Sequence, residues 1–171
     1  VWALSGYVGA GLGFAQTDDS DAATTTDGGS FSGTTRVGMV FGRQFRLGLN
    51  FTSWSKTETV GTTDISTAIY PIAIEGNWHF IQDNSGPYIG ASAASVLELT
   101  VTDTLASSMD DTDTDSETGL GAQVGWNFAL GSKDMHSIGI EARYLFVTAE
   151  PQDYDFMAGY VVYTFWFGGR N

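Results

Sequence analysis

Large apolar residues alternate strictly with small or polar residues in eight successive runs, and this alternation constrains the chain more than any other feature. The first run, for example, places Val8, Leu12 and Phe14 on one face and Tyr7 and Gly9 on the other. A period of two is typical of β-strands, because successive side chains point to opposite faces of a sheet. The sequence has no run of 18 apolar residues, so it does not predict a membrane-spanning helix.

The connections between the runs alternate between short turns and long polar stretches. The long ones are QTDDSDAATTTDGGSFSG, SKTETVGTTD, TDTLASSMDDTDTDSET and AEPQDYD. Outer-membrane barrels have short periplasmic turns and long outer loops, and a tilted strand of about 9–11 residues crosses a bilayer. The sequence therefore predicts one domain over residues 1–171. We expect an all-β, eight-stranded antiparallel up-and-down transmembrane β-barrel with long acidic outer loops, located in the bacterial outer membrane.

A soluble β-sandwich or lipocalin-like barrel is the alternative fold, and it would bury its apolar face. Here the opposite face is rich in Gly and Ser, and these side chains are too small to make that face of a sheet soluble in water. Aromatic residues on the apolar face are expected at two levels, as two membrane–water interfaces require. The expected inner level is Trp2, Phe45, Trp78, Phe80, Trp126, Phe128, Phe165 and Phe167, and the outer level is Phe14, Phe51, Tyr70, Tyr144 and Phe146.

Two segments resemble a known family. IEGNWHF, a short turn and PYIGASAAS are similar to a hairpin of OmpW-like and of OmpX- or opacity-like small outer-membrane proteins, and YVVYTFWF resembles their aromatic carboxy-terminal strand. The chain departs from that pattern by adding GGRN after Phe167. The resemblance implies a surface barrel: OmpW-like members are associated with passive uptake of small hydrophobic compounds, and OmpX- and opacity-like members with structural or adhesive roles.

The inward face of the predicted barrel carries charged residues. An eight-stranded barrel is only wide enough for its side chains to fill, so these charges must pair. Arg46 and Glu75 lie on adjacent strands and are expected to form one pair. A packed polar plug is the structural interpretation, and a gated conduction path is the alternative. The predicted lumen charge network is Arg36, Arg46, Glu75, Glu98, Glu141 and Arg143.

The sequence does not predict an enzyme. It has no cysteine, His79 is expected to be a hydrogen-bonded plug residue near the inner rim, and His136 lies in a turn. Neither histidine can be combined with a serine and an acid for acyl transfer. With only seven Lys and Arg residues and a net charge of −13, the chain is also not expected to bind nucleic acid.

The acidity of the chain is concentrated in the long loops, which carry fifteen carboxylates and only one basic residue, Lys56. Dense carboxylates suit Ca²⁺ or Mg²⁺, although the spacing is not that of an EF-hand. A merely solvated acidic loop is the alternative, and no cofactor is required by the fold. The candidate metal ligands are Asp110, Asp111, Asp113, Asp115 and Glu117, together with Asp18, Asp19 and Asp21.

These observations predict a non-enzymatic barrel with a structural or surface-interaction role carried by its acidic, cation-binding outer loops. The expected partners are outer-membrane lipid and, through those loops, either a second copy or another envelope component. An OmpW-like passive pore for small hydrophobic molecules is one alternative. A barrel subunit that self-assembles into an array or filament is the other.

Overall fold

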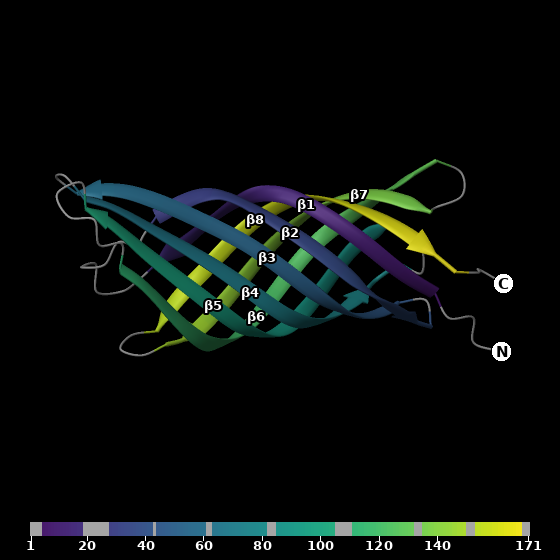
Figure 1. Cartoon of the computed structure of the whole chain (residues 1–171). Helices are drawn as coiled ribbons and strands as arrows, with labels where there is room; N and C mark the ends of the chain where they lie inside the picture. The colour runs from purple at the N-terminus through teal and green to yellow at the C-terminus, as the bar shows by residue number, and fades with distance from the viewer. Residues whose placement is uncertain are drawn as a thin grey trace.

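The computed structural model describes residues 5–18, 28–42, 44–60, 63–81, 85–104, 111–131, 135–149 and 153–168. Within these ranges each strand pairs antiparallel with the next, and β8 pairs with β1 to close a barrel (Figure 1). The predicted eight-stranded antiparallel barrel is thus confirmed. The strands are β1 (Ser5–Asp18), β2 (Gly28–Phe41), β3 (Phe45–Val60), β4 (Thr63–His79), β5 (Gly86–Thr104), β6 (Asp111–Leu130), β7 (His136–Thr148) and β8 (Tyr154–Phe167).

We call the end that carries the β1–β2, β3–β4, β5–β6 and β7–β8 connections the outer end, and the opposite end the inner end. β1 begins and β8 finishes at the inner end, on the right of Figure 1. The part of the chain that the structure describes contains no helix that is long and apolar enough to cross a membrane.

The strands are longer than the ten or so residues that the alternation predicts, ranging from 13 residues in β7 to 20 in β6. β3 continues to Val60 and β5 to Thr104, so much of the sequence expected to be loop is strand. The apolar alternation marks only the lipid-facing part of each strand. Beyond the lipid-facing part, the sequence is rich in Thr, which favours β-strand. The strands therefore remain hydrogen-bonded to one another outside the membrane.

The wall of the barrel is uneven at its outer end. β5 and β6 pair as far as Thr102 and Asp111, whereas β6 and β7 pair only as far as Thr118 and Thr148. β3 and β4 likewise remain paired up to Val60, although the pairing between β2 and β3 ends at Trp54. The β3–β6 side therefore extends furthest from the inner end.

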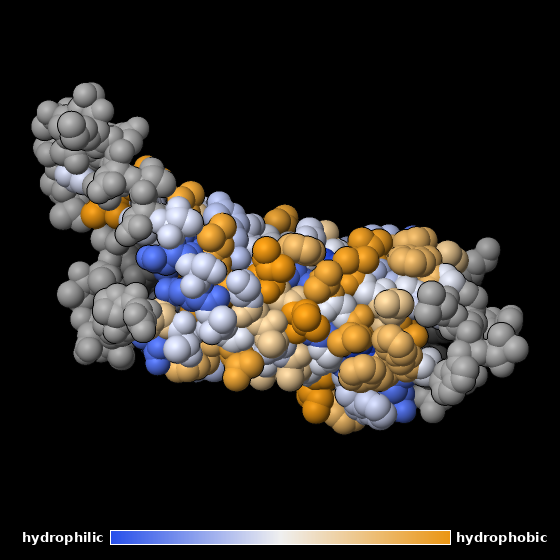
Figure 2. Space-filling view, turned by 60° about the horizontal axis from the view of Figure 1, so that its bottom comes forward, coloured by the Kyte–Doolittle hydropathy of each residue, from blue (hydrophilic) through white to orange (hydrophobic). Residues whose placement is uncertain are grey.

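Apolar side chains cover the outside of the barrel. Figure 2 shows them over much of the visible wall, with hydrophilic residues gathered most densely toward the outer end, on the left. Trp126 and Phe80 of the expected inner level are exposed, as are Phe14 and Tyr70 of the outer level, so these aromatics face lipid. Trp2 lies outside the described residues.

Glycines allow large side chains to lie flat against the inner wall. Gly38 of β2 and Gly48 of β3 are opposite each other, and Tyr7 of β1 packs over both. A Cβ on Gly38 would overlap the Leu47 carbonyl oxygen, and one on Gly48 would overlap the Tyr7 hydroxyl. Tyr7 is consequently only 2% exposed and contacts the Trp166 ring, 5.3 Å away between centroids.

Candidate functional site

The middle of the lumen is closed by ion pairs contributed by β2, β4 and β7. Glu141 accepts hydrogen bonds from Arg36 at 2.9 Å and from Arg143 at 2.8 Å. The same Arg143 donates to Glu75 at 3.1 Å. All four side chains are at least nine-tenths buried, so each charge is compensated where it has no access to solvent. We call Arg36, Glu75, Glu141 and Arg143 the lumen network.

Neutral side chains extend the hydrogen bonding of the lumen network, in which the Nε atoms of Arg36 and Arg143 have no hydrogen-bond partner among the described residues. Tyr88 donates to Glu141 at 2.5 Å, Arg143 donates to the Asn50 side-chain oxygen at 2.6 Å, and Asn77 donates to Glu75 at 3.4 Å. Gln123 in turn donates to Asn77 at 2.9 Å. The layer thus connects the six strands from β2 to β7 across the lumen.

Glu75 forms its salt bridge with Arg143 of β7, a partner that was not expected from the sequence, and the expected pairing with Arg46 stays a prediction. Arg46 lies one layer closer to the inner end. Its guanidinium contacts the His79 ring and stands 4.1 Å from the centre of the Trp166 ring. Adjacency along the sheet suggested the Arg46 pairing, but long side chains in a narrow barrel reach across the lumen to opposite strands.

Glu98 is also placed differently from the prediction, since it does not join the lumen network. It lies on the inner face of β5 close to the outer end and is only half-buried. The acidic residues that act on it are Glu117 and Asp115 of β6. These three carboxylates, Glu98, Asp115 and Glu117, are called the acidic mouth below.

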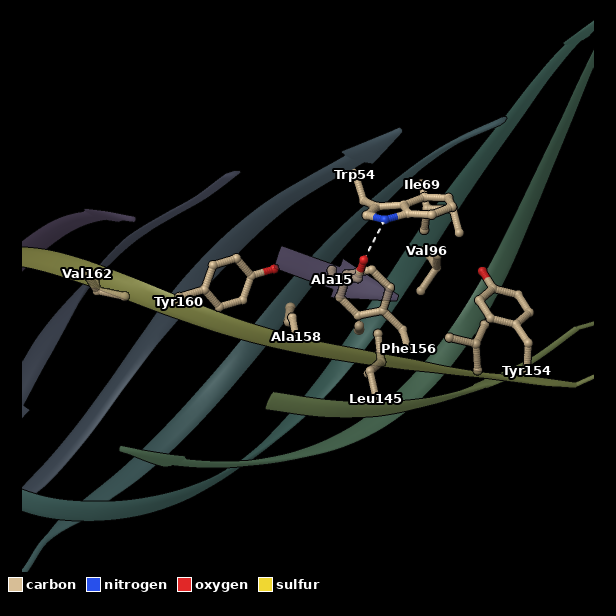
Figure 3. Packing of buried hydrophobic residues seen from close by; sticks show 13 residues of the cluster. Ala15, Trp54, Ile69, Val96, Leu145, Tyr154, Phe156, Ala158, Tyr160 and Val162 are labelled. Carbon is tan, nitrogen blue, oxygen red and sulfur yellow. Dashed lines mark hydrogen bonds between the residues drawn. The ribbon is translucent and has the colours of Figure 1, made fainter. Parts of the chain in front are cut away.

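Between the lumen network and the acidic mouth the lumen is filled by apolar side chains (Figure 3). Trp54 is at the centre of this layer, 1% exposed, and its indole N–H donates to the Ala15 carbonyl oxygen at 3.0 Å. We call this layer the apolar plug; its principal members are Trp54, Ile69, Val96, Leu145, Val147 and Phe156.

The apolar plug was not expected from the sequence, which predicts a polar filling throughout the lumen. The alternation along each strand does place these residues in the lumen. Trp54 lies an even number of residues after the inward-facing Asn50 and Thr52, and Leu145 lies two residues after Arg143, so both side chains point inward. These residues were not assigned to the lumen, because the strands were expected to end at the edge of the lipid-facing band.

The predicted metal ligands are only partly covered by the structure. Asp19, Asp21 and Asp110 lie outside the described residues, and Asp111 and Asp113 belong to β6, where their side chains are not described. Asp18 is exposed at the end of β1. Among the described residues no three His, Cys, Asp or Glu side chains are grouped so that they could hold a metal ion.

The two histidines occupy different surroundings. His79 is 2% exposed, as expected for a plug residue near the inner rim, and stacks on Tyr88 with 4.7 Å between ring centroids. His136 begins β7 and its Nδ1 atom lies 2.5 Å from the Tyr163 hydroxyl.

Comparison with known proteins supports the same architecture. A family model described as outer membrane protein beta-barrel domain matches residues 3–165. The fold is similar to that of Neisserial surface protein A (NspA), with a TM-score of 0.72 and 18% sequence identity over 94% of this chain and 96% of that one. No curated protein sequence matches the chain significantly.

Two further solved structures share the fold. One is Ail, the attachment invasion locus protein of Yersinia pestis, in complex with the heparin analogue sucrose octasulfate (TM-score 0.65, 11% identity, covering 95% of this chain and 99% of that one). The other is the outer membrane protein OprG from Pseudomonas aeruginosa (TM-score 0.51, 9% identity, covering 96% and 95%). The family match spans most of the chain, so the chain belongs to the outer-membrane protein β-barrel domain family and lies in the bacterial outer membrane.

Proposed function

We propose that this barrel is a non-enzymatic structural and surface-interaction protein whose outer end binds cations and cationic partners. The observation that carries the proposal is the filled lumen: the lumen network and the apolar plug lie one above the other, and the carboxylates are concentrated beyond them. Chemistry that depends on passage through the barrel is disfavoured by this arrangement, whereas recognition at the outer end is favoured.

The alternative of an OmpW-like passive pore for small hydrophobic molecules requires a lined path through the lumen. Trp54, Val96 and Phe156 occupy the outer part of that path, and the ion pairs of Arg36 and Arg143 occupy its middle. Moving a buried, paired arginine aside to admit a solute would expose unpaired charge, which is costly in a low-dielectric interior. The closed barrel is therefore the stronger proposal.

The charge of the outer end specifies the chemistry of its partner. The long connections and the outer ends of the strands together carry fifteen carboxylates and only Lys56 as a basic residue. At roughly 0.15 M salt the screening length is about 8 Å, so neighbouring carboxylates still repel one another. The Ail structure contains a sulfated, anionic ligand, whereas the charge of this chain favours the opposite partner. Divalent cations that bridge the loops to anionic lipid, to a second copy or to another envelope component would relieve the repulsion.

Calorimetry with Ca²⁺ tests this proposal. We expect weak uptake, with a dissociation constant on the order of 10⁻⁴–10⁻³ M, as in the weakest class of protein Ca²⁺ sites. Chelator should increase proteolysis of the outer loops but leave the barrel folded, since its backbone hydrogen bonds close on themselves. The residues expected to contribute are Asp110, Asp111, Asp113, Asp115 and Glu117, with Asp18, Asp19 and Asp21.

A matched pair of variants locates the effect. Replacing Asp110 and Asp111 by asparagine should weaken Ca²⁺ uptake, while replacing Asp83 and Asp134 in the short connections changes the net charge equally and should not. Absence of Ca²⁺ uptake at millimolar concentration, combined with loop proteolysis that ignores chelator, would show that the loops are only solvated.

A further inference from the structure

The lipid-facing wall of the barrel has a hollow of about 770 Å³ that spans β1, β2 and β3 and is bordered by β8 and β4. Its floor is formed by Gly33 and Thr35 of β2, with Ser53 of β3 opposite Gly33 and Ala10 of β1 opposite Thr35. A Cβ on Gly33 would meet only the Ser53 hydroxyl oxygen, at 3.3 Å. Small residues on three adjacent strands therefore create this depression, which we call the wall hollow.

Large, mainly apolar side chains surround the wall hollow. Phe51, Tyr70 and Ile72 stand on the side of β3 and β4, and Leu12 and Tyr163 stand on the side of β1 and β8. All five are exposed and belong to the outer surface that faces lipid. The wall hollow consequently opens sideways into the bilayer, and not into the lumen.

Two hydroxyl groups face this otherwise apolar space. The side chains of Thr35 and Ser53 are exposed on the wall, and each hydroxyl can donate one hydrogen bond. On β3 the outward-facing apolar residues end at Phe51, and Ser53 is the next residue that faces outward. The hydroxyls thus lie where the hydrocarbon region meets the headgroup region, which is the depth of the carbonyl oxygens that link lipid chains to their headgroups.

The shape of the surrounding wall favours a flexible chain over a second barrel as the occupant. Leu12 and Phe31 stand beside the wall hollow and project furthest from the wall, with exposed fractions of 78% and 86%. A rigid wall that approached across these projections would leave the floor of the hollow uncovered, and the atoms that line a void lose their dispersion contacts. An acyl chain can bend to cover the floor, and its carbonyl oxygen supplies an acceptor for the two hydroxyls.

We propose that the wall hollow binds one ester-linked acyl chain of an outer-leaflet lipid. The chain lies over Gly33 between the two apolar sides of the hollow. The hydroxyls of Thr35 and Ser53 donate to the carbonyl oxygen that joins the chain to its headgroup. This site goes beyond the proposed function, because it requires neither the acidic loops nor a bound cation.

The test uses the full chain in nanodiscs made from equal amounts of two phosphatidylcholines with the same chain length. One lipid has ester-linked chains, and the other has ether-linked chains and therefore no carbonyl oxygen. Native mass spectrometry of the released barrel measures which lipid remains bound. We expect the ester-linked lipid to be retained about threefold to tenfold more often, the effect of one or two neutral hydrogen bonds. Thr35→Val combined with Ser53→Ala leaves the hollow open and should remove this preference.

A matched pair of glycine variants tests the volume of the wall hollow. Gly33→Leu fills the floor and should reduce the retention of both lipids. Gly159→Leu is the control, because Gly159 of β8 also lies on the lipid-facing wall, outside the wall hollow, and a Cβ there meets nothing within 4 Å. This control should leave both the retention and the preference for the ester-linked lipid unchanged.

Photo-crosslinking identifies the occupant directly. An ester-linked lipid with a diazirine group on its chain should label peptides of β2 and β3 in the wild-type barrel, and this labelling should be lost in Gly33→Leu. Equal retention of the two lipids by the wild-type chain, or a preference that survives removal of both hydroxyls, would overturn the inference. Chemical cross-links that join two barrels through β2 and β3 would also overturn it, by identifying a second copy as the occupant. Ca²⁺ uptake by the outer loops is measured separately, so failure of this inference leaves the proposed function intact.

Discussion

Glu141→Ala is expected to destabilise the barrel by about 3–5 kcal/mol, the usual cost of breaking a buried ion pair by removing one partner. Glu141 is the acceptor shared by Arg36, Arg143 and Tyr88. Without it Arg36 loses its carboxylate partner, while Arg143 keeps Glu75 and Asn50. The free energy of unfolding, measured by urea titration of the barrel in lipid vesicles, checks this expectation.

Glu75→Ala is the internal control for that measurement. Glu75 accepts from Arg143 and Asn77, and its removal leaves Arg143 still bonded to Glu141 and Asn50. We therefore expect a smaller loss, about 1–3 kcal/mol. Equal destabilisation by the two single substitutions would contradict the central position of Glu141 in the lumen network.

Trp54→Ala should destabilise the barrel by about 3–5 kcal/mol, the typical cost of truncating a fully buried tryptophan. The Trp54 side chain is 1% exposed and fills the centre of the apolar plug. Its removal leaves a cavity between two rigid walls that cannot collapse onto each other, because the backbone ladder of a closed barrel fixes their separation. The same urea titration measures the effect.

Trp54→Phe distinguishes packing from hydrogen bonding at this position. Phenylalanine keeps an aromatic ring in the plug but loses the bond from the indole N–H to the Ala15 carbonyl oxygen. We expect the variant to lose about 1–3 kcal/mol, the cost of leaving a buried acceptor unsatisfied. A loss as large as that of Trp54→Ala would mean that the hydrogen bond, rather than the volume of the ring, stabilises the plug.

The membrane-facing half of the fold could be predicted from sequence because lipid imposes a simple rule. Every second residue of the crossing segment must be apolar, so Val8, Leu12 and Phe14 identify β1 without reference to any other strand. The outer halves of β3 to β6 follow no such rule, because they leave the lipid. Their Thr-rich sequence is compatible with strand and with loop, and the pairing of β5 with β6 decides between them.

The lumen was predictable in composition but not in connectivity. The register identifies Arg36, Arg46, Arg143 and Glu75 as inward-facing, and the structure buries all four. Which arginine reaches which carboxylate depends on contacts across the barrel, and these are set by strand tilt and by side-chain length rather than by sequence neighbours. The acidic mouth was missed for a related reason, since Glu98 and Glu117 had been assigned to different regions, lumen and loop.

A closed lumen should carry no ionic current, and conductance across a planar bilayer measures this most directly. The barrel is inserted from detergent and the current is compared with that of a porin inserted in the same bilayer as the positive control. We predict no steady single-channel conductance for the wild-type chain, because the lumen network and the apolar plug both close the path. Stable, reproducible channels that carry current through the folded wild-type barrel would show instead that the lumen is open.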